Sequence, residues 1–281
     1  MYRKVRFLLI LCCLAVFGQA KAQFDDPKTI EVGPHAGVSY YMGDINPLYP
    51  FAMPDLQYGG VLRYNQNSRW TFRFDYTHAT VHGSDEKIKW RPERGLSFTS
   101  VINDFSLMAE FNFLEYYTGN PKRNVSPYIF GGISVFMYDV FTDVAGTSVN
   151  LGEYNTEAPL PEDAKWYDKM FAKNSPVAIS IPFGMGVKLA LSKHMAATIE
   201  WRMQKTLTDY LDDVATVYPE QHAIYTAEDG TEYDLSDPTG NYHTNQQRGN
   251  AAFDDWFGVA GVSLTWKFNL PDGRGCNLSK F

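Results

Sequence analysis

The chain has 281 residues with 25 Lys and Arg against 32 Asp and Glu, and aromatic residues make up 15% of it while charged residues make up only 20%. The net charge of −7 argues against nucleic acid as a partner, because phosphate contacts need clustered cations. No apolar run has the ~20 residues that a membrane-spanning helix needs. The composition suits a membrane β-barrel, although a large β-sandwich could share it.

The first 22 residues are organised like a secretory signal peptide. Basic residues precede an apolar run over Phe7–Phe17, and small residues at Ala20 and Ala22 permit cleavage near Ala22. Cleavage would remove four of the 25 cations and none of the acids, leaving a net charge of about −11 and one cysteine, Cys276, which cannot form an internal disulfide. We expect residues 1–22 to be a signal peptide and residues 23–281 to form one domain.

Eight segments alternate apolar and polar residues with a period of two, as β-strands with two different faces do. In chain order they are Ile30–Met42, Leu56–Asn65, Trp70–Thr77, about Leu96–Phe113, Ser126–Tyr138, Val177–Leu191, Ala197–Gln204 and Trp256–Phe268. The clearest is Val177–Leu191, where large apolar residues from Ile179 onward alternate with small or polar ones. The fifth segment is glycine-rich, and its pattern does not show which of its residues face outward and which face inward.

Three positions predict interruptions of regular strand pairing. The alternation in the fourth segment slips near Asn103-Asp104, which indicates a β-bulge. Pro34 and Pro182 offer no N–H to a ladder, and a closed barrel has no free edge for them. We expect bulges at both prolines as well.

The connections between the segments alternate in length. Asn65–Arg69 and Ser192–His194 are short, and Glu115–Val125 is intermediate. The connections after the odd-numbered segments are longer, chiefly the acid-rich stretches within Asp139–Pro176 and Tyr218–Phe253. Short periplasmic turns and long external loops are typical of outer-membrane barrels, and eight strands place both chain ends in the periplasm.

The sequence therefore predicts an all-β fold, an eight-stranded antiparallel transmembrane β-barrel of the outer-membrane type with long external loops. Its apolar face would meet lipid, and aromatic residues at the strand ends would lie at the two membrane interfaces. Those expected at periplasmic ends are Tyr64, Trp70, Phe113, Trp266 and Phe268, and those expected at external ends are Tyr40, Tyr76 and Trp256.

Charged residues occupy many of the inward positions of these segments. The cations are Arg63, Arg73, Lys188, Arg202 and Lys267, and the anions are Glu31, Asp75, Glu110 and Glu200. Charges in a poorly solvated interior should pair rather than stay isolated, and eight strands leave a lumen that side chains roughly fill. We expect a stabilising salt-bridge network, the alternative being a selective pore.

Candidate catalytic and metal-binding groups are few. His35 and Ser39 point inward on the first segment but lie ~13 Å apart along it, too far for a nucleophile and its base, and Asp44 follows in the loop. His78 and His82 are expected at a strand end and in a loop. The acidic run Asp209, Asp212 and Asp213 has oxygen ligands suited to calcium but lacks the spacing and turn glycine of a known loop. We expect no catalytic, cofactor or metal site.

Several blocks resemble one known family. Tyr40-Tyr41-Met42-Gly43-Asp44-Ile45-Asn46-Pro47 is similar to its Tyr-Tyr-Leu-Gly-Asp-Leu-Asn-Pro signature, and Thr208–Val214 and Arg248-Gly249-Asn250 follow in the expected order. Together they resemble the PorG-like outer-membrane barrels of the type IX secretion system of Bacteroidota. The signature residues are Gly43, Asp44, Asn46, Pro47, Asp209, Tyr210, Asp212 and Asp213.

The resemblance implies a non-enzymatic component of the protein secretion machinery that anchors or positions a periplasmic ring of PorK–PorN type. Such a ring could reach only the turns, the chain ends and Glu115–Val125. The candidate contacts there are Lys122 and Arg123, with Arg274 in the C-terminal tail. Outer-membrane lipid is the other expected partner, and no small-molecule substrate is indicated.

Two alternatives remain open at this point. One is a small outer-membrane barrel that passes small or apolar solutes, which would conduct or support uptake. The other is a lipid-modifying barrel enzyme, for which the sequence shows no suitable cluster of Ser, His and Asp.

Overall fold

The structure is a computed structural model that describes residues 28–160, 166–170 and 177–270. The expected signal peptide, Cys276 and Arg274 lie outside these residues. Among the helices that the structure describes, none has both the length and the apolar character needed to cross a membrane.

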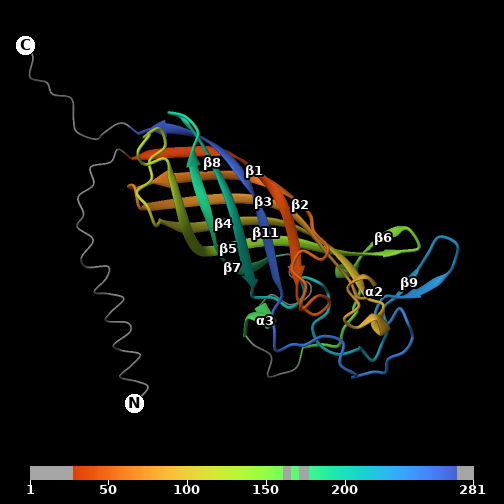
Figure 1. Ribbon diagram of the computed structural model, residues 1–281. Coiled ribbons are helices and arrows are strands. Elements are labelled where there is room, and N and C mark those ends of the chain that lie inside the picture. Colours follow the sequence, from red (N-terminus) through yellow and green to blue (C-terminus); the bar gives the residue numbers. More distant parts are fainter. Residues whose placement is uncertain (1–27, 161–165, 171–176, 271–281) are drawn as a thin grey trace, which may run out of the picture.

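Eight long antiparallel strands close into a barrel (Figure 1). They are β1 (Thr29–Met42), β2 (Asp55–Asn65), β3 (Trp70–Ser84), β4 (Ser97–Asn112), β5 (Val125–Val144), β7 (Val177–Ala190), β8 (Met195–Thr206) and β11 (Trp256–Asn269). Each strand pairs with its neighbour in the chain, and β1 pairs with β11 from Thr29↔Asn269 to Met42↔Trp256. This closure confirms the expected eight-stranded barrel and excludes a two-sheet sandwich.

Short helices and short strands lie at the end of the barrel opposite to the described chain ends (Figure 1). They are α2 (Asp85–Ile88), η1 (Pro92–Arg94), β6 (Thr147–Asn150), η2 (Leu151–Glu153), α3 (Trp166–Met170), β9 (Ile224–Thr226) and β10 (Glu232–Asp234). Because Thr29 and Asn269 are direct partners, the chain enters and leaves the barrel at the same end. We call this the terminal end, and the end that carries the long connections the loop end.

The outer wall of the barrel is apolar and the inner wall is polar. On β7, Phe183, Met185 and Val187 are 42–56% exposed, whereas Ser180 and Lys188 on the opposite face are buried. The same alternation leaves Leu62, Phe72, Leu107, Ile129, Ile199, Val262 and Trp266 exposed on the neighbouring strands. A continuous apolar outer surface around a polar interior is the arrangement of a barrel whose wall faces lipid.

The prediction of a bulge at Asn103-Asp104 is wrong. β4 pairs with β3 in one unbroken register through Asn103↔His78 and Asp104↔Thr77, and its buried residues alternate without a slip. The apparent change of phase arises because Phe98 and Ile102 point inward beneath the loop end, where the interior is apolar. In the sequence, an inward apolar residue in the half of a strand nearer the loop end cannot be told from an outward, lipid-facing residue in the other half.

Bulges at the two prolines are also wrong. Pairing between β1 and β11 lapses around Pro34 but resumes in the same register, from Val32↔Trp266 to His35↔Ser263. Pairing of Pro182 with β5 lapses in the same way, while its register with β8 continues through Pro182↔Gln204. Each proline therefore omits ladder bonds without inserting an extra residue.

Two of the expected external interface aromatics differ from the expectation, one in its position and one in its exposure. Tyr76 faces out from the middle of β3, because this strand continues to Ser84 instead of ending near Thr77. Tyr40 is 1% exposed, because Phe51 from the β1–β2 connection covers its ring at 4.1 Å.

The main buried apolar cluster lies at the loop end. It includes Tyr41, Ile45, Phe98, Ile102, Phe136, Leu211, Val214 and Phe257. Because the cluster draws on strands and on all four of the long connections, the loops pack into the mouth of the barrel as a small core of their own.

We predict that Met185→Arg destabilises the membrane-inserted barrel by about 2–4 kcal/mol, because it places a charge on the lipid-facing wall near mid-strand. Urea unfolding in lipid vesicles measures the change. Glu228→Arg, on an exposed loop residue, is the control and should shift the midpoint little. Equal stability of the two variants would argue against a lipid-facing β7.

Candidate functional site

A connected ion-pair cluster fills the middle of the barrel around Glu110 of β4. The Glu110 carboxylate lies 3.2 Å from Arg63 Nε, 2.9 Å from Arg73 Nη1 and 2.5 Å from Lys188 Nζ. These residues come from β2, β3 and β7, and all are at most 2% exposed. One carboxylate thus pairs with three cations that reach it from opposite sides of the lumen.

Arg73 extends the cluster toward the loop end. Its guanidinium lies 2.7 Å from Glu200 Oε2 and 3.1 Å from Asp75 Oδ2. Asp75 also lies 3.2 Å from Arg202 Nη1, and Arg202 donates its other terminal nitrogen to Thr77 Oγ1 at 2.9 Å.

Aromatic rings of β5 compensate the surplus cation of this cluster. The Phe130 ring lies 4.4 Å from Arg73 Cζ, and the Tyr128 ring lies 4.9 Å from Lys188 Nζ. Tyr128 also donates a hydrogen bond to Glu200 at 2.8 Å. A ring face attracts a cation, and the attraction grows when water is excluded.

The packed side chains leave little free volume in the middle of the lumen. A cavity of about 10 Å³, bordered by His35, Arg63, Asp75, Glu200 and Arg202, is at the lower limit for one water molecule. An interior filled in this way is expected for eight strands.

The β4–β5 connection closes the terminal end. Thr118 is buried there and donates to Glu31 Oε1 at 2.5 Å, and Thr265 donates to the other Glu31 oxygen at 3.2 Å. Lys267 Nζ donates to the Thr118 carbonyl and lies 4.6 Å from the Tyr117 ring. Glu31 and Lys267 are cross-strand neighbours, so this connection joins them and caps the lumen.

The candidate partner contacts differ in their surroundings. Lys122 is exposed at the tip of the same connection, where its backbone N–H donates to Asn120 Oδ1. Arg123 is partly buried and lies 3.1 Å from Glu115. Arg274 lies outside the described residues.

At the loop end, segments far apart in the sequence meet in a buried junction, which we define as Tyr41, Asp44, Asp209, Asp212 and Asp255. The Tyr41 hydroxyl donates to Asp212 Oδ2 and, at 3.0 Å, to Asp255 Oδ1. Asp44 Oδ2 accepts the backbone N–H of Asn250 at 2.5 Å. The structure thus brings the signature blocks after β1 and β8 against the Arg248-Gly249-Asn250 block.

Glycine is required where this junction is tightest. A Cβ on Gly43 would lie 2.1 Å from both Asp255 Oδ1 and the Tyr41 hydroxyl, and one on Gly249 would lie 2.6 Å from Asp44 Oδ2. Asn46 fixes the same loop by donating from Nδ2 to the Tyr41 carbonyl at 3.1 Å.

Burial and mutual repulsion favour protonated carboxyls in the junction. Burial raises the pKa of Asp44 to about 6, against the opposing effect of the Asn250 N–H and of Arg94. Burial followed by repulsion from Asp255 and Asp212 raises the pKa of Asp209 to about 12. Burial first, then their acidic neighbours, also place the pKa values of Asp212 and Asp255 well above the ordinary range.

Two buried arginines hold the loops around the junction. Arg94 pairs with Asp85 at 2.6 Å and donates to the backbone carbonyls of Asp44 and Arg248. Arg248 lies 2.9 Å from Glu157. The Arg248–Glu157 ion pair therefore ties the β8–β11 connection to the β5–β7 connection, and the hydrogen bond from Arg94 to the Arg248 carbonyl ties the β3–β4 connection to both.

Asp213 and Tyr210 complete the signature residues at this end. Asp213 accepts from the Thr156 hydroxyl, lies 4.0 Å from Arg248 Nη2 and has a positive φ of 61°. Tyr210 is buried, and Pro47 is partly buried in the β1–β2 connection.

The histidines and serine considered for catalysis occupy separate places. His35 contacts Gln57 and the Tyr76 carbonyl, and Ser39 donates to the Thr80 carbonyl at 2.6 Å. His78 contacts Asn103, and His82 lies 2.5 Å from Asp55. In the described part of the chain, no group of His, Cys, Asp and Glu has a geometry that could hold a metal ion.

The sequence analysis did not identify several residues of the Glu110 cluster and of the surroundings of the junction. Tyr128 and Phe130 could have been placed from the alternation of Ser126, Tyr128, Phe130 and Ser134, had the glycines Gly131 and Gly132 not obscured it. Arg94 and Glu157 carry no sequence signal, because they lie in loops without periodicity.

Comparison with models of known families finds one that matches the chain. The family model described as "Domain of unknown function (DUF6089)" matches residues 5–160, which is more than half of the chain. The chain belongs to this family. The DUF6089 match includes the signature residues Gly43–Pro47 and the Glu110 cluster's β2, β3 and β4 members, and it ends before the Asp209–Asp213 run. No curated protein matches the chain.

Solved barrels with similar structures include three of bacterial origin. The N-terminal β-barrel domain of Pseudomonas aeruginosa OprF is 12% identical, with 85% of this chain and 97% of that chain covered and a TM-score of 0.38. Neisserial surface protein A is 12% identical (86% and 96% covered, TM-score 0.39), and the outer membrane protein OprG from Pseudomonas aeruginosa is 8% identical (87% and 97% covered, TM-score 0.39). The barrel assignment itself follows from the strand pairing described above.

We predict that Glu110→Gln destabilises the barrel by about 3–5 kcal/mol, because it leaves Arg63, Arg73 and Lys188 buried without their shared carboxylate. Urea unfolding in lipid vesicles measures the loss. Glu228→Gln, an exposed acid, is the matched control and should change stability by less than about 0.5 kcal/mol. A Glu110→Gln midpoint equal to that of the control would show that the lumen cations do not depend on this residue.

We also predict that the loop end loosens as pH rises. A raised pKa means that the folded junction keeps protons that the unfolded chain releases, so stability falls as pH increases from about 4 through about 6 and above. Asp44→Asn should reduce the loss of folding free energy between low and high pH by up to about 3 kcal/mol.

Hydrogen exchange of the residue 207–216 amides at pH 5 and pH 8, corrected for the intrinsic rate, measures the effect. Asp229→Asn, a fully exposed acid, is the control and should keep the wild-type difference. Faster exchange at pH 5 than at pH 8 would reverse the sign and contradict the prediction.

Proposed function

We propose that the protein is a small outer-membrane barrel that acts as a non-enzymatic scaffold and not as a pore. The observation that carries the proposal is the combination of an apolar outer wall with a lumen closed by the Glu110 cluster. The wall fits lipid contact. Buried ion pairs resist opening, because breaking one leaves an uncompensated charge in a space that excludes water.

The resemblance to PorG-like barrels supports a finer proposal, in which the scaffold belongs to a type IX protein secretion machinery and positions a periplasmic ring of PorK–PorN type. In this proposal the terminal end faces the periplasm. Its surface consists of the turns Asn65–Arg69 and Ser192–His194 and of the connection Glu115–Val125. Lys122 on that connection is an exposed cation that an acidic surface of a partner can meet.

Conductance tests the scaffold part of the proposal. The purified protein in planar bilayers should show no steady channel openings, because side chains fill the middle of the lumen. The matched variant Glu110→Ala, if it assembles, opens a gap in the cluster and is the positive comparison. Steady openings of the wild type would favour passage of small solutes instead.

Co-purification tests the secretion part of the proposal. A tagged protein extracted in mild detergent should retain periplasmic ring proteins, and Lys122→Glu should reduce their recovery by about fivefold or more, since reversal of a rim charge adds repulsion. Lys87→Glu, an exposed charge reversal on α2 at the loop end, is the control and should leave recovery unchanged. Wild-type recovery of ring proteins with Lys122→Glu would exclude this contact, and no recovery with either protein would contradict the secretion role.

A further inference from the structure

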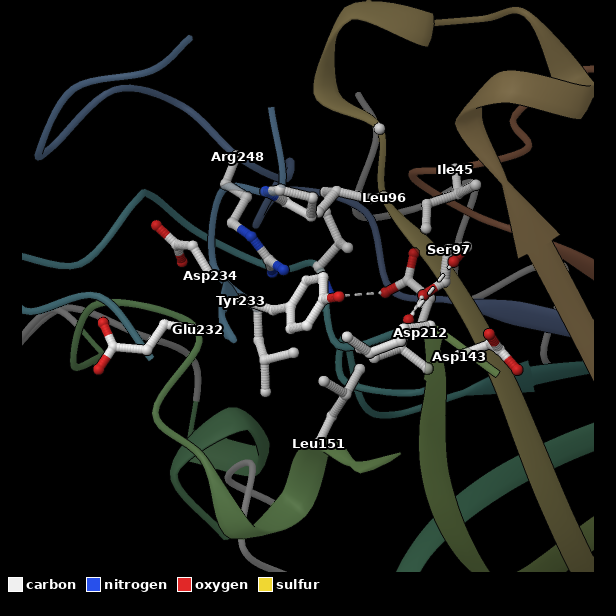
Figure 2. Close-up of a pocket in the computed structure, with 17 residues that line it drawn as sticks. Ile45, Leu96, Ser97, Asp143, Leu151, Asp212, Glu232, Tyr233, Asp234 and Arg248 are labelled. Atoms are coloured by element: carbon white, nitrogen blue, oxygen red, sulfur yellow. Dashed lines mark hydrogen bonds between the residues drawn. The ribbon is translucent and has the colours of Figure 1, made fainter. Parts of the chain in front are cut away.

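A pocket of about 310 Å³ opens in the loop layer beside the junction (Figure 2). Its lining comes from six separate parts of the chain: the signature loop, the start of β4, the β5–β6 hairpin, η2, the segment after β8, and the stretch from β10 to Arg248. A volume of this size is within the range of small-molecule sites.

The apolar wall of the pocket is fixed by the loop-end core. Leu96, Leu151 and Leu235 line it and are each at most 5% exposed, and all three belong to the main buried cluster. Val144 packs against the same cluster at the opening. Because the core holds these side chains, a ligand would find the wall already formed and would not have to order it.

Carboxylates flank the opening on two sides. Figure 2 shows Glu232 and Asp234 on one side of the Tyr233 ring and Asp143 on the other. Asp143 and Glu232 are exposed, and Asp234 already contacts His222.

The other ionisable lining residues contribute little net charge. Arg248 is the cation of the lining, and its guanidinium is occupied by Glu157 and by the Asp213 carbonyl. Asp212 at the floor is bonded to Tyr41 and to the Val214 N–H, and its surroundings favour the protonated form. The field at the opening is therefore set by Asp143 and Glu232, with the Tyr233 ring between them as a further surface for a cation.

We propose that this pocket binds a small amphipathic cation, with its ammonium group at the opening that Asp143 and Glu232 flank and an aliphatic body of about the size of a leucine side chain against Leu96 and Leu151. An anionic ligand of the same shape would meet two like charges. A neutral ligand would gain the apolar contact alone. The proposal is independent of the scaffold function, because none of these residues lines the lumen or the terminal end.

Three water-soluble probes that share the leucine side chain test the charge and the apolar contact together: L-leucinamide (cation), N-acetyl-L-leucinamide (neutral) and N-acetyl-L-leucine (anion). The full chain in lipid nanodiscs, with labelled Leu and Val methyl groups, reports binding by NMR. L-leucinamide should shift the methyl signals of Leu96, Leu151 and Val214, with a Kd on the order of millimolar for so small a ligand. The lipid-facing Leu189 should stay unchanged.

The neutral probe should bind about tenfold more weakly and the anion should not bind. Asp143→Asn with Glu232→Gln should reduce the L-leucinamide affinity about fivefold to tenfold, since each partly exposed charge contributes modestly. Asp139→Asn with Glu228→Gln removes the same charge from exposed positions outside the pocket and should keep wild-type affinity. Ser97→Trp, at an exposed lining residue, should block binding while the methyl spectrum of the barrel is retained.

Equal affinity for the three probes would overturn the proposal, as would an L-leucinamide titration without methyl shifts at concentrations about ten times the expected Kd. Wild-type binding by Ser97→Trp would place the ligand elsewhere and would overturn it too. Equal losses in the two double variants would show that long-range charge, and not this opening, selects the cation.

Discussion

Neutralising charge in a space without bulk water is the constraint on which this structure depends. The wall of the barrel is one residue thick, so a strand that presents Met185 or Val187 to the outside must present Lys188 or Gly186 to the inside. An apolar exterior therefore concentrates polar and charged side chains in the lumen. The interior then has to supply its own counter-charges, and Glu110 supplies them to Arg63, Arg73 and Lys188 at once. The remaining excess of cation is met by the rings of Tyr128 and Phe130.

The period of two was sufficient to predict the strands and the side of the wall on which most residues lie. Ile181, Phe183 and Met185 are exposed and Lys188 is buried, as the alternation of Val177–Leu191 indicates. The prediction was wrong where the environment changes along a strand. Phe98 and Ile102 of the fourth segment are apolar yet point inward, because the loops and not lipid or charge fill the barrel near its loop end. Periodicity reports which residues share a face, and it carries no information on what that face contacts.

The candidate sites likewise differ in how far the sequence could predict them. The charged inward residues could be named from their strand positions, because the register of the barrel pairs Arg63 with Arg73 and places Glu110 opposite Thr71, two residues from Arg73. The junction could not be assembled in this way. Its members Asp44, Asp212 and Asp255 lie in connections without periodicity, and their contacts through Tyr41 and Asn250 depend on how long loops fold back. The resemblance named several of these residues, but only the three-dimensional arrangement shows that they meet.

The two ends of the barrel are closed by different chemistry, and this difference bears on how the protein could act across a membrane. The terminal end is capped by a short connection that joins Glu31 to Lys267 through Thr118. The loop end is covered by a junction of carboxyls that favour protonation, braced by Arg94 and Arg248. Between these ends the lumen is packed with paired charges, so a solute passing through it would have to separate them. Loops at one end and turns at the other are instead joined by a rigid, closed sheet. Such a body can fix the position of partners on both sides of a membrane, and this is the property that a scaffold requires.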